Sequence, residues 1–224
     1  MKKTLLIAFI LSCLTSFASA AGVKVGITGS GYEIDATGKE EKLTRTDQNR
    51  TETLEGATAS MFAEFNIDVP VLPAGLSIGV DYVPYDIDMG AVENARNALG
   101  NNNQSNQGSD GQVGTNTADI VLEGSTTLYV LIPTEAGLYL KLGYSEADVI
   151  INETMTTGSN YPNQTLEGLH VNLGLEKEMG PIFVRGEVGF SDWDTVKSTS
   201  STGRTTYSAD LDGTNVRISI GKAF

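Results

Sequence analysis

The sequence predicts an all-β fold: an eight-stranded antiparallel transmembrane barrel of the up-and-down type, formed after an amino-terminal leader is removed. Three observations predict it. Apolar and polar residues alternate in eight segments of the chain. The connections between these segments are alternately short and long. The residues on the other face of many segments are small or uncharged, as the interior of a narrow barrel requires.

The leader has the features of a secretory signal peptide. Lys2 and Lys3 form a positive region, residues 5–14 form an apolar region, and Ala-Ser-Ala at 18–20 forms a cleavage site. We therefore expect residues 1–20 to be removed and residues 21–224 to form the barrel domain. A lipoprotein leader ending in the Cys of the apolar stretch is the weaker alternative.

Removal of the leader changes the net charge and the cysteine content of the protein. The formal net charge falls from −13 to −15, because the leader holds two lysines and no acidic residue. The only cysteine, Cys13, is also lost, which excludes disulfides and thiol chemistry from the mature protein. Such acidity argues against nucleic acid as a partner, because phosphates are bound by clustered Lys and Arg. No later segment approaches the roughly 18 apolar residues of a spanning helix.

Each expected strand has a period of two residues, so that one of its faces is apolar. Helical spacing fits none of the segments well. In chain order, the segments and their apolar residues are 22–34 (Val23, Val25, Ile27), 54–67 (Ala57, Ala59, Met61, Ala63, Phe65, Ile67), 76–86 (Leu76, Ile78, Val80, Tyr82), 119–132 (Ile120, Leu122, Leu128, Val130, Ile132), 138–150 (Leu138, Leu140, Leu142, Tyr144), 166–177 (Leu169, Val171, Leu173, Leu175), 181–192 (Ile182, Val184, Val188, Phe190) and 208–224 (Val216, Ile218, Ile220, Phe224).

The connections indicate which strand ends lie together. Short turns marked by Pro or Gly follow the second, fourth and sixth segments, and long polar connections follow the others. This alternation is typical of outer-membrane barrels, whose short turns face the periplasm and whose long loops face outside. The longest connection includes a low-complexity stretch, which we expect to be solvated, with an adhesive epitope as the alternative. The expected external loops are about 35–53, 87–118, 151–165 and 193–207.

If the apolar face contacts lipid, the other face lines the lumen, and most charges within the segments fall on it. Because an eight-stranded barrel is just wide enough for side chains to fill, opposite charges there are expected to pair and plug the lumen. A narrow path for small ions is the alternative. Aromatic residues near the segment ends, among them Tyr32 and Trp193, predict interfacial girdles. The expected lumen charge network consists of Lys24, Glu64, Asp81, Glu123, Lys141, His170, Glu176, Arg185, Glu187 and Arg217.

The sequence offers little for catalysis. His170 is the only histidine, and no candidate nucleophile is placed beside it. The acidic pair Asp86 and Asp88 lacks the later ligands of a calcium loop. We therefore expect that the protein is not an enzyme and that it has no catalytic residue, no metal site and no cofactor.

The leader, the eight segments, the alternating connections and the terminal Phe224 together resemble the small outer-membrane β-barrel proteins of the OmpA, OmpX and opacity-protein type. Segments 137–168 and 216–224 look like barrels of marine alphaproteobacteria. The resemblance implies location in the outer membrane of a Gram-negative bacterium and contact with its lipid and lipopolysaccharide. Because no peptidoglycan-binding domain follows Phe224 in this sequence, we do not expect a cell-wall tether. The resemblance also implies recognition by the barrel-assembly machinery through the last strand, where Lys222 departs from the usual pattern. The expected assembly signal consists of Val216, Ile218, Ile220 and Phe224.

The expected function is structural: a barrel with a charge-plugged lumen that presents acidic polar loops to the outside. Two other hypotheses stay open. One is a narrow pore for ions or small solutes. The other is a secreted β-sandwich adhesin, in which the apolar face would be a core instead of a lipid surface.

Overall fold

The computed structural model describes the chain in seven stretches. The expected signal peptide, residues 1–20, lies outside them, as does the centre of the longest expected loop, residues 97–113. In the described part of the chain, no helix is long and apolar enough to cross a membrane. The described residues are 22–42, 48–69, 72–96, 114–134, 136–154, 160–201 and 205–224.

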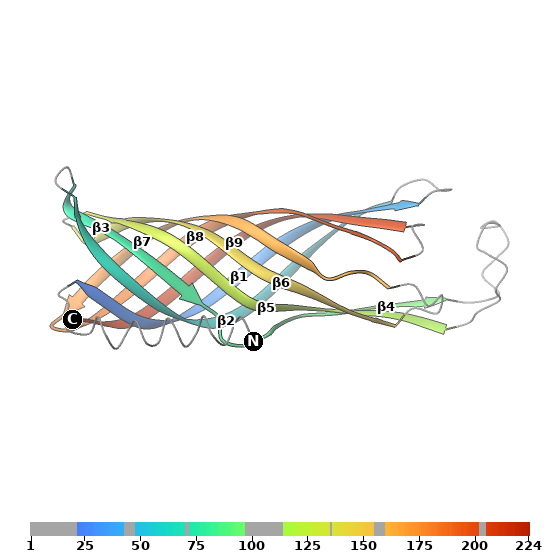
Figure 1. Cartoon of the computed structure of the whole chain (residues 1–224), viewed down its shortest axis with the longest axis horizontal. Helices are drawn as coiled ribbons and strands as arrows, with labels where there is room; N and C mark the ends of the chain where they lie inside the picture. Colours follow the sequence, from blue (N-terminus) through green and yellow to red (C-terminus); the bar gives the residue numbers. More distant parts are fainter. Residues whose placement is uncertain are drawn as a thin grey trace.

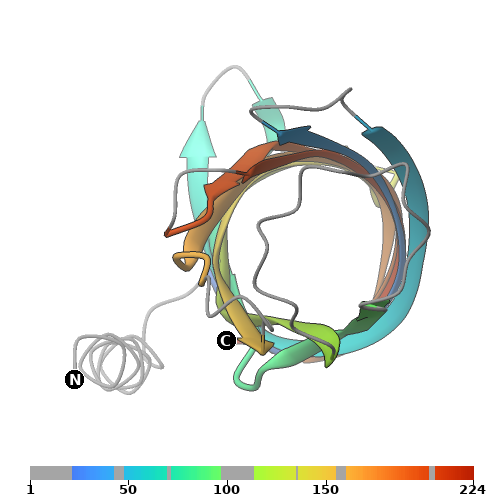
Figure 2. The same ribbon diagram turned by 90° about the vertical axis from the view of Figure 1, so that its right-hand side faces the viewer.

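The described residues form nine antiparallel strands in one sheet, and eight of these strands close into a ring (Figures 1 and 2). The ring order is β3-β2-β1-β9-β8-β7-β6-β5, and pairing of β3 with β5 closes it. The predicted eight-stranded barrel is therefore confirmed, and the β-sandwich hypothesis is wrong. The strands are β1 (Val23–Lys42), β2 (Gln48–Val69), β3 (Leu72–Tyr82), β4 (Ile87–Arg96), β5 (Gly114–Pro133), β6 (Leu138–Thr154), β7 (Gln164–Met179), β8 (Ile182–Thr199) and β9 (Thr205–Ala223).

The ninth strand lies outside the predicted segments. β3 ends at Tyr82, within the predicted segment 76–86, and β4 begins at Ile87, in the expected loop 87–118, after a short irregular stretch that contains Pro84. Proline has no N–H to donate to a ladder, so a strand tends to end or bend there. β3 pairs with both β2 and β5, whereas β4 continues along β5 alone.

The strands reach much further towards the long connections than predicted. The expected loops 35–53, 87–118, 151–165 and 193–207 are strand over most of their described residues. On β1 and β2 the outward residues of these extensions are polar, as at Asp35 and Thr53, so the apolar set used for the prediction stops at the edge of the lipid zone. The extensions are nevertheless rich in Thr, which favours strands, and those of β1 and β2 continue the register of the membrane-spanning part.

The two halves of the barrel have opposite polarity. Near the short turns, the outward side chains are apolar and open to the surroundings, as at Ile27 (59% exposed), Leu128 (60%) and Ile218 (67%). Near the long connections, the inward face includes buried apolar side chains such as Val149 and Leu166. The outward residues at that level include many carboxylates. The apolar outer band therefore covers only the half of the barrel that holds the short turns.

The first described residue, Gly22, meets the carboxyl terminus at the short-turn end, where C is marked at the left of Figure 1. The N–H of Gly22 donates to the carbonyl oxygen of Phe224 over 3.0 Å, and the N–H of Phe224 donates to the carbonyl oxygen of Val23 over 2.9 Å. The last strand is thus fixed to the first one along its whole length.

Candidate functional site: a charge network across the lumen

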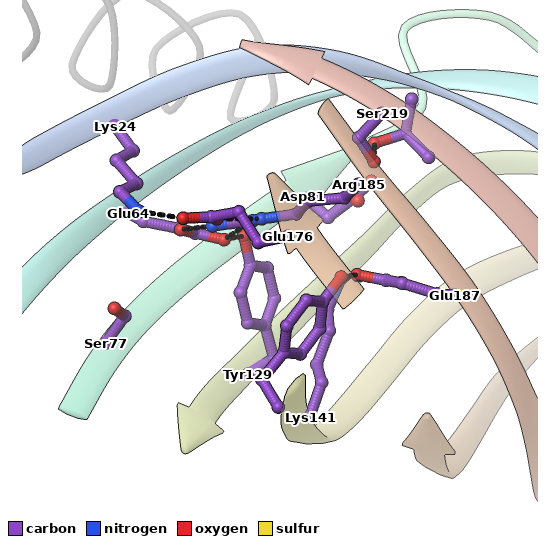
Figure 3. A network of polar contacts seen from close by, with 12 residues as sticks. Lys24, Glu64, Ser77, Asp81, Tyr129, Lys141, Glu176, Arg185, Glu187 and Ser219 are labelled. Carbon is purple, nitrogen blue, oxygen red and sulfur yellow. Dashed lines mark hydrogen bonds and ion pairs between the residues drawn. The ribbon is translucent and has the colours of Figure 1, made fainter. Parts of the chain in front are cut away.

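The lumen near the short turns is filled by charged side chains that come from almost every strand of the ring (Figure 3). Four are basic and four are acidic, and β5 supplies a tyrosine that bonds to one of the acids. The eight charged residues are Lys24, Glu64, Asp81, Lys141, Glu176, Arg185, Glu187 and Arg217.

Arg185 is the centre of the first cluster. Its Nη2 donates to Glu64 Oε2 over 2.7 Å, its Nη1 donates to Glu64 Oε1, and its Nε donates to Glu176 Oε2 over 2.6 Å. The Tyr129 hydroxyl donates to Glu64 over 2.7 Å, and Lys24 pairs with Glu176. The Arg185 and Glu64 side chains are 2% and 0% exposed. A two-pronged Arg–carboxylate pair is strong and fixes the geometry of both groups.

Aromatic rings enclose the same guanidinium group. Its carbon atom lies 4.6 Å from the Phe183 ring centre, 5.4 Å from that of Phe62 and 5.5 Å from that of Tyr139. Such contacts between a cation and a ring face are stabilising, more so where water is excluded. Arg185 is therefore held by two carboxylates and three rings, and the rings fill space that water would otherwise occupy.

Glu187 is the centre of the second cluster. Its carboxylate accepts a hydrogen bond from the Tyr139 hydroxyl over 2.7 Å and from Asn172 Nδ2 over 3.2 Å. Lys141 Nζ lies 3.5 Å from it and Arg217 Nε lies 3.4 Å from it. Four polar groups from β6, β7 and β9 thus converge on one buried carboxylate.

Two contacts complete the network. Arg217 also pairs with Asp81 of β3, and Lys141 Nζ lies 4.1 Å above the Tyr129 ring, which belongs to the first cluster. The two clusters are therefore joined through the Lys141–Tyr129 contact into one body of side chains.

Glycines on neighbouring strands make room for the two tyrosines. A Cβ atom placed on Gly79 would lie 2.4 Å from the Tyr129 ring, and one placed on Gly174 would lie 2.2 Å from the Tyr139 ring. This explains part of the small-residue pattern on the lumen face. The tyrosines were not among the residues predicted for the network. Their place on the lumen face was the signal available in the sequence, whereas the glycine opposite each one follows from the strand register.

Glu123 does not join the network, and its predicted place in the lumen is wrong. A β-bulge separates Glu123 from Thr126, and Gly124 within it has a φ of +62°. Beyond the bulge, Leu122 pairs with the buried Val149 and so faces inward. Glu123, its neighbour, therefore faces outward. The extra residue of the bulge reverses the inside–outside alternation, which no count by twos can reveal.

His170 lies on the lumen face as predicted, one step above the network. Its ring meets the Trp193 ring edge-on, with 4.9 Å between the ring centres. Trp193 and Tyr32 were predicted for the interfacial girdle, but both face the lumen. Their rings lie over the glycines of neighbouring strands, Gly168 and Gly56, where an added Cβ would clash.

Several polar atoms of side chains in the barrel are buried without a hydrogen-bond partner in the described part of the chain. They are Ser60 Oγ, His170 Nε2, Asn172 Oδ1 and Asn215 Oδ1. The Asn172 amide is oriented by its Nδ2–H bond to Glu187, so its oxygen is the atom that points away from the network. Buried polar atoms in proteins are nearly always bonded, and a small polar molecule could satisfy these.

The described residues contain no group of three or more His, Cys, Asp and Glu side chains that could hold a metal ion. The predicted assembly signal, Val216, Ile218, Ile220 and Phe224, lies on the outward face of β9, with each side chain between 44% and 67% exposed. Lys222 faces outward with them, and its Nζ lies 4.5 Å from the Phe224 ring.

No protein-family model and no curated protein matches this chain. Solved structures do. OprG of Pseudomonas aeruginosa is 12% identical, with a TM-score of 0.52, over 91% of this chain and 96% of that one. Neisserial surface protein A is 13% identical, with a TM-score of 0.43, over 88% and 97% of the two chains. The outer membrane protease OmpT of Escherichia coli is 10% identical, with a TM-score of 0.39, over 91% and 97%.

At these identities the likeness concerns the fold. The chain has the fold of the outer-membrane β-barrel protein OprG, and its predicted location in the outer membrane of a Gram-negative bacterium agrees with this fold. The expected lack of enzymatic activity stays a prediction.

Proposed function

We propose that the protein is a structural barrel of the outer membrane, whose lumen is closed by the charge network and whose outer end presents an acidic surface. The observation that carries the proposal is the direction of the ion pairs. Lys24–Glu176, Glu64–Arg185 and Asp81–Arg217 each join strands that have two other strands between them in the ring. In a ring of eight, such pairs lie almost opposite each other, so their side chains cross the lumen.

Energetics support a structural role for these pairs. Burying a charge is costly, and the cost is offset only when the charge is paired and fully hydrogen-bonded. Arg185 and Glu187 meet this condition, each with several partners. A conducting path through the same cross-section would have to separate these partners.

The outer surface beyond the lipid zone supports the second part of the proposal. Carboxylates lie directly opposite each other on adjacent strands: Asp192 and Asp35 both pair with Asp212, and Glu33 pairs with Glu55. Like charges so placed repel each other, and the surface around the barrel has a negative potential. We also propose that lipid and lipopolysaccharide surround the apolar band, and that the barrel-assembly machinery recognises the last strand.

Conductance of the mature protein in a planar bilayer tests the closed lumen. The protein is first shown to be folded by its faster migration in detergent gels before boiling. We expect no discrete openings from wild type and small openings from Arg185→Ala, because that substitution removes the side chain at the centre of the first cluster. Reproducible openings of the wild-type protein, with a conductance that fits a path for hydrated ions, would refute the structural proposal.

A second candidate function, the narrow pore, is favoured by one observation. Ser60 Oγ, His170 Nε2, Asn172 Oδ1 and Asn215 Oδ1 are buried and lack a hydrogen-bond partner in the described part of the chain. A water-bearing section of the lumen would satisfy them, and it would leave only the two clusters as a barrier. In this case wild type itself would conduct, and Asp81→Asn or Glu187→Gln would change the ratio of cation to anion permeability.

A further inference from the structure

The wall of the barrel is not paired over its whole height. The last pairing of β2 with β3 is between Met61 and Tyr82. Beyond it, β2 runs on to Gln48 paired with β1 alone, and β4 runs on paired with β5 alone. Within the described residues, no pairing joins β2 to β4. We call this interruption the seam. In Figure 1 the blue end of β1, which β2 accompanies, and the green β4–β5 pair lie on opposite sides of the right-hand end.

The side chain of Tyr85 marks the base of the seam. Its hydroxyl accepts a hydrogen bond from the backbone N–H of Ala59 and lies 2.9 Å from Thr58 Oγ1. The Ala59 N–H therefore points into the seam, where the neighbouring strand has ended. Backbone groups of successive strand residues point to opposite sides, and the register of β2 is unbroken here. The N–H and C=O groups of Thr51, Thr53, Glu55 and Ala57 hence point into the seam as well.

An unpaired strand edge is a template for another strand, and proteins that do not use such an edge usually cover it or break it. Five residues of this edge, at alternate positions from 51 to 59, have the same orientation. Among them, only Ala59 has an N–H that is bonded to a side chain of the described chain. The edge spans residues 51–59 of β2, so it is long enough for an ordinary strand of about 5–6 residues. Strand addition of this kind obtains affinity from main-chain hydrogen bonds and specificity from alternate side chains.

Charge indicates what kind of strand would fit. Glu55 lies on the outward face of the edge, Glu33 is its cross-strand neighbour on β1, and Asp86 is exposed on the other side of the seam. A partner with basic residues on its outward face would place cations opposite these carboxylates. A second copy of this chain fits poorly, because its own edge would bring like charges opposite each other.

We propose that the β2 edge, residues 51–59, binds an extended basic peptide segment of another protein by strand addition at the seam. This inference goes beyond the proposed structural function and does not depend on whether the lumen conducts. The backbone supplies the hydrogen bonds, and the acidic side chains select the basic partner.

The probe is a fluorescent octapeptide of alternating Lys and Val, added to the folded mature protein in detergent. A matched probe carries N-methyl groups on its four central residues, which removes backbone donors and keeps the charge. We expect the first probe to bind at least tenfold more tightly than the second, by fluorescence anisotropy. We also expect it to slow amide hydrogen exchange within residues 51–57. Equal binding of both probes would mean charge attraction alone and would overturn the proposal.

Two variants test the edge itself. Thr53→Pro removes an N–H that points into the seam, and edge strands tolerate proline at such positions. Thr53→Ala is the control, because Thr53 Oγ1 also donates to Asp35 over 2.7 Å and both variants lose this bond. We expect at least a tenfold loss of probe affinity for Thr53→Pro and less than a twofold loss for Thr53→Ala. Similar losses for both would overturn the proposal.

Two further measurements keep the test decisive if Thr53→Pro does not fold. Glu55→Gln should weaken binding several-fold and reduce its salt dependence, and an unchanged affinity would contradict the charge argument. Sedimentation of wild type without peptide should show one copy per micelle. A dimer that protects the amides of residues 51–57 would assign the edge to a second copy and overturn the peptide proposal.

Discussion

The membrane-spanning half of the barrel and its extension towards the long connections use the same strands in opposite ways. In the spanning half, the outside is apolar and the inside holds paired charges. In the extension, the outside holds carboxylates and the inside holds apolar side chains such as Leu166. The difference teaches that the surroundings of each face determine its residues: lipid requires an apolar exterior, and water allows the interior to become an ordinary apolar core.

The two halves also differ in what stabilises them. Ion pairs across the lumen fix distant strands of the spanning half to each other. The extension has its buried apolar residues, rows of like charge outside and a seam on one side. We therefore expect the extension to open before the spanning half does, and regions with unpaired edges are commonly of low local stability.

The largest expected effect comes from the centre of the network. Arg185→Ala leaves Glu64 and Glu176 without their main partner, and removing one member of a buried ion pair costs about 3–5 kcal/mol. The melting temperature in detergent, followed by circular dichroism, should fall strongly. The control is Lys197→Ala, because the Lys197 side chain is exposed on the extension. If the two variants melt alike, the network does not stabilise the barrel.

A pair of leucines on one strand compares the two halves directly. Leu166 is inward in the extension and 4% exposed, whereas Leu173 is outward in the lipid band and 57% exposed. Leu166→Ala creates a cavity in an apolar core, at a cost of about 2–5 kcal/mol. Leu173→Ala should cost much less, because lipid or detergent fills the space. Chemical denaturation of both variants in the same micelles measures the difference. A larger loss for Leu173→Ala would contradict the assignment of the two faces.

The smallest expected effect concerns the carboxylate rows. Asp212 lies between Asp35 and Asp192 on adjacent strands, so Asp212→Asn should relieve repulsion and raise the free energy of unfolding by about 0.2–1 kcal/mol at low salt. The gain should shrink at high salt, because exposed charges are then screened. Asp68→Asn, near a short turn, is the matched control. A gain that does not change with salt would exclude repulsion as its cause.

Much of the fold follows from the sequence because lipid imposes a strict rule on one face. Outward positions in the lipid band are apolar, apart from Lys222 near the end of the last strand, so a period of two identifies the strands and assigns Lys141, Arg185 and Arg217 to the lumen. This rule does not apply to the extensions. Their outward face meets water, and their apolar residues change to the other face, so the strands appear to end where only the lipid ends.

The bulge beside Glu123 and the seam beside Tyr85 could not be predicted for a related reason. A bulge inserts one residue and depends on how two strands fit together, and the seam depends on which strand lies beyond the one that ends. Both are properties of pairs of strands that are distant in the sequence. Tyr129 was missed because its role depends on Gly79 of β3, which the sequence does not place next to it.

The sequence by itself determined the barrel, the number of strands in its ring and most of the charged side chains that line the lumen, because alternation against lipid is a local requirement. Only the tertiary structure decided which charges meet. The stagger of strands around the ring sets the depth of each residue, and closure brings Glu64 across to Arg185 and Asp81 across to Arg217. Stagger and closure arise from the pairing of all strands together, and no single segment contains them.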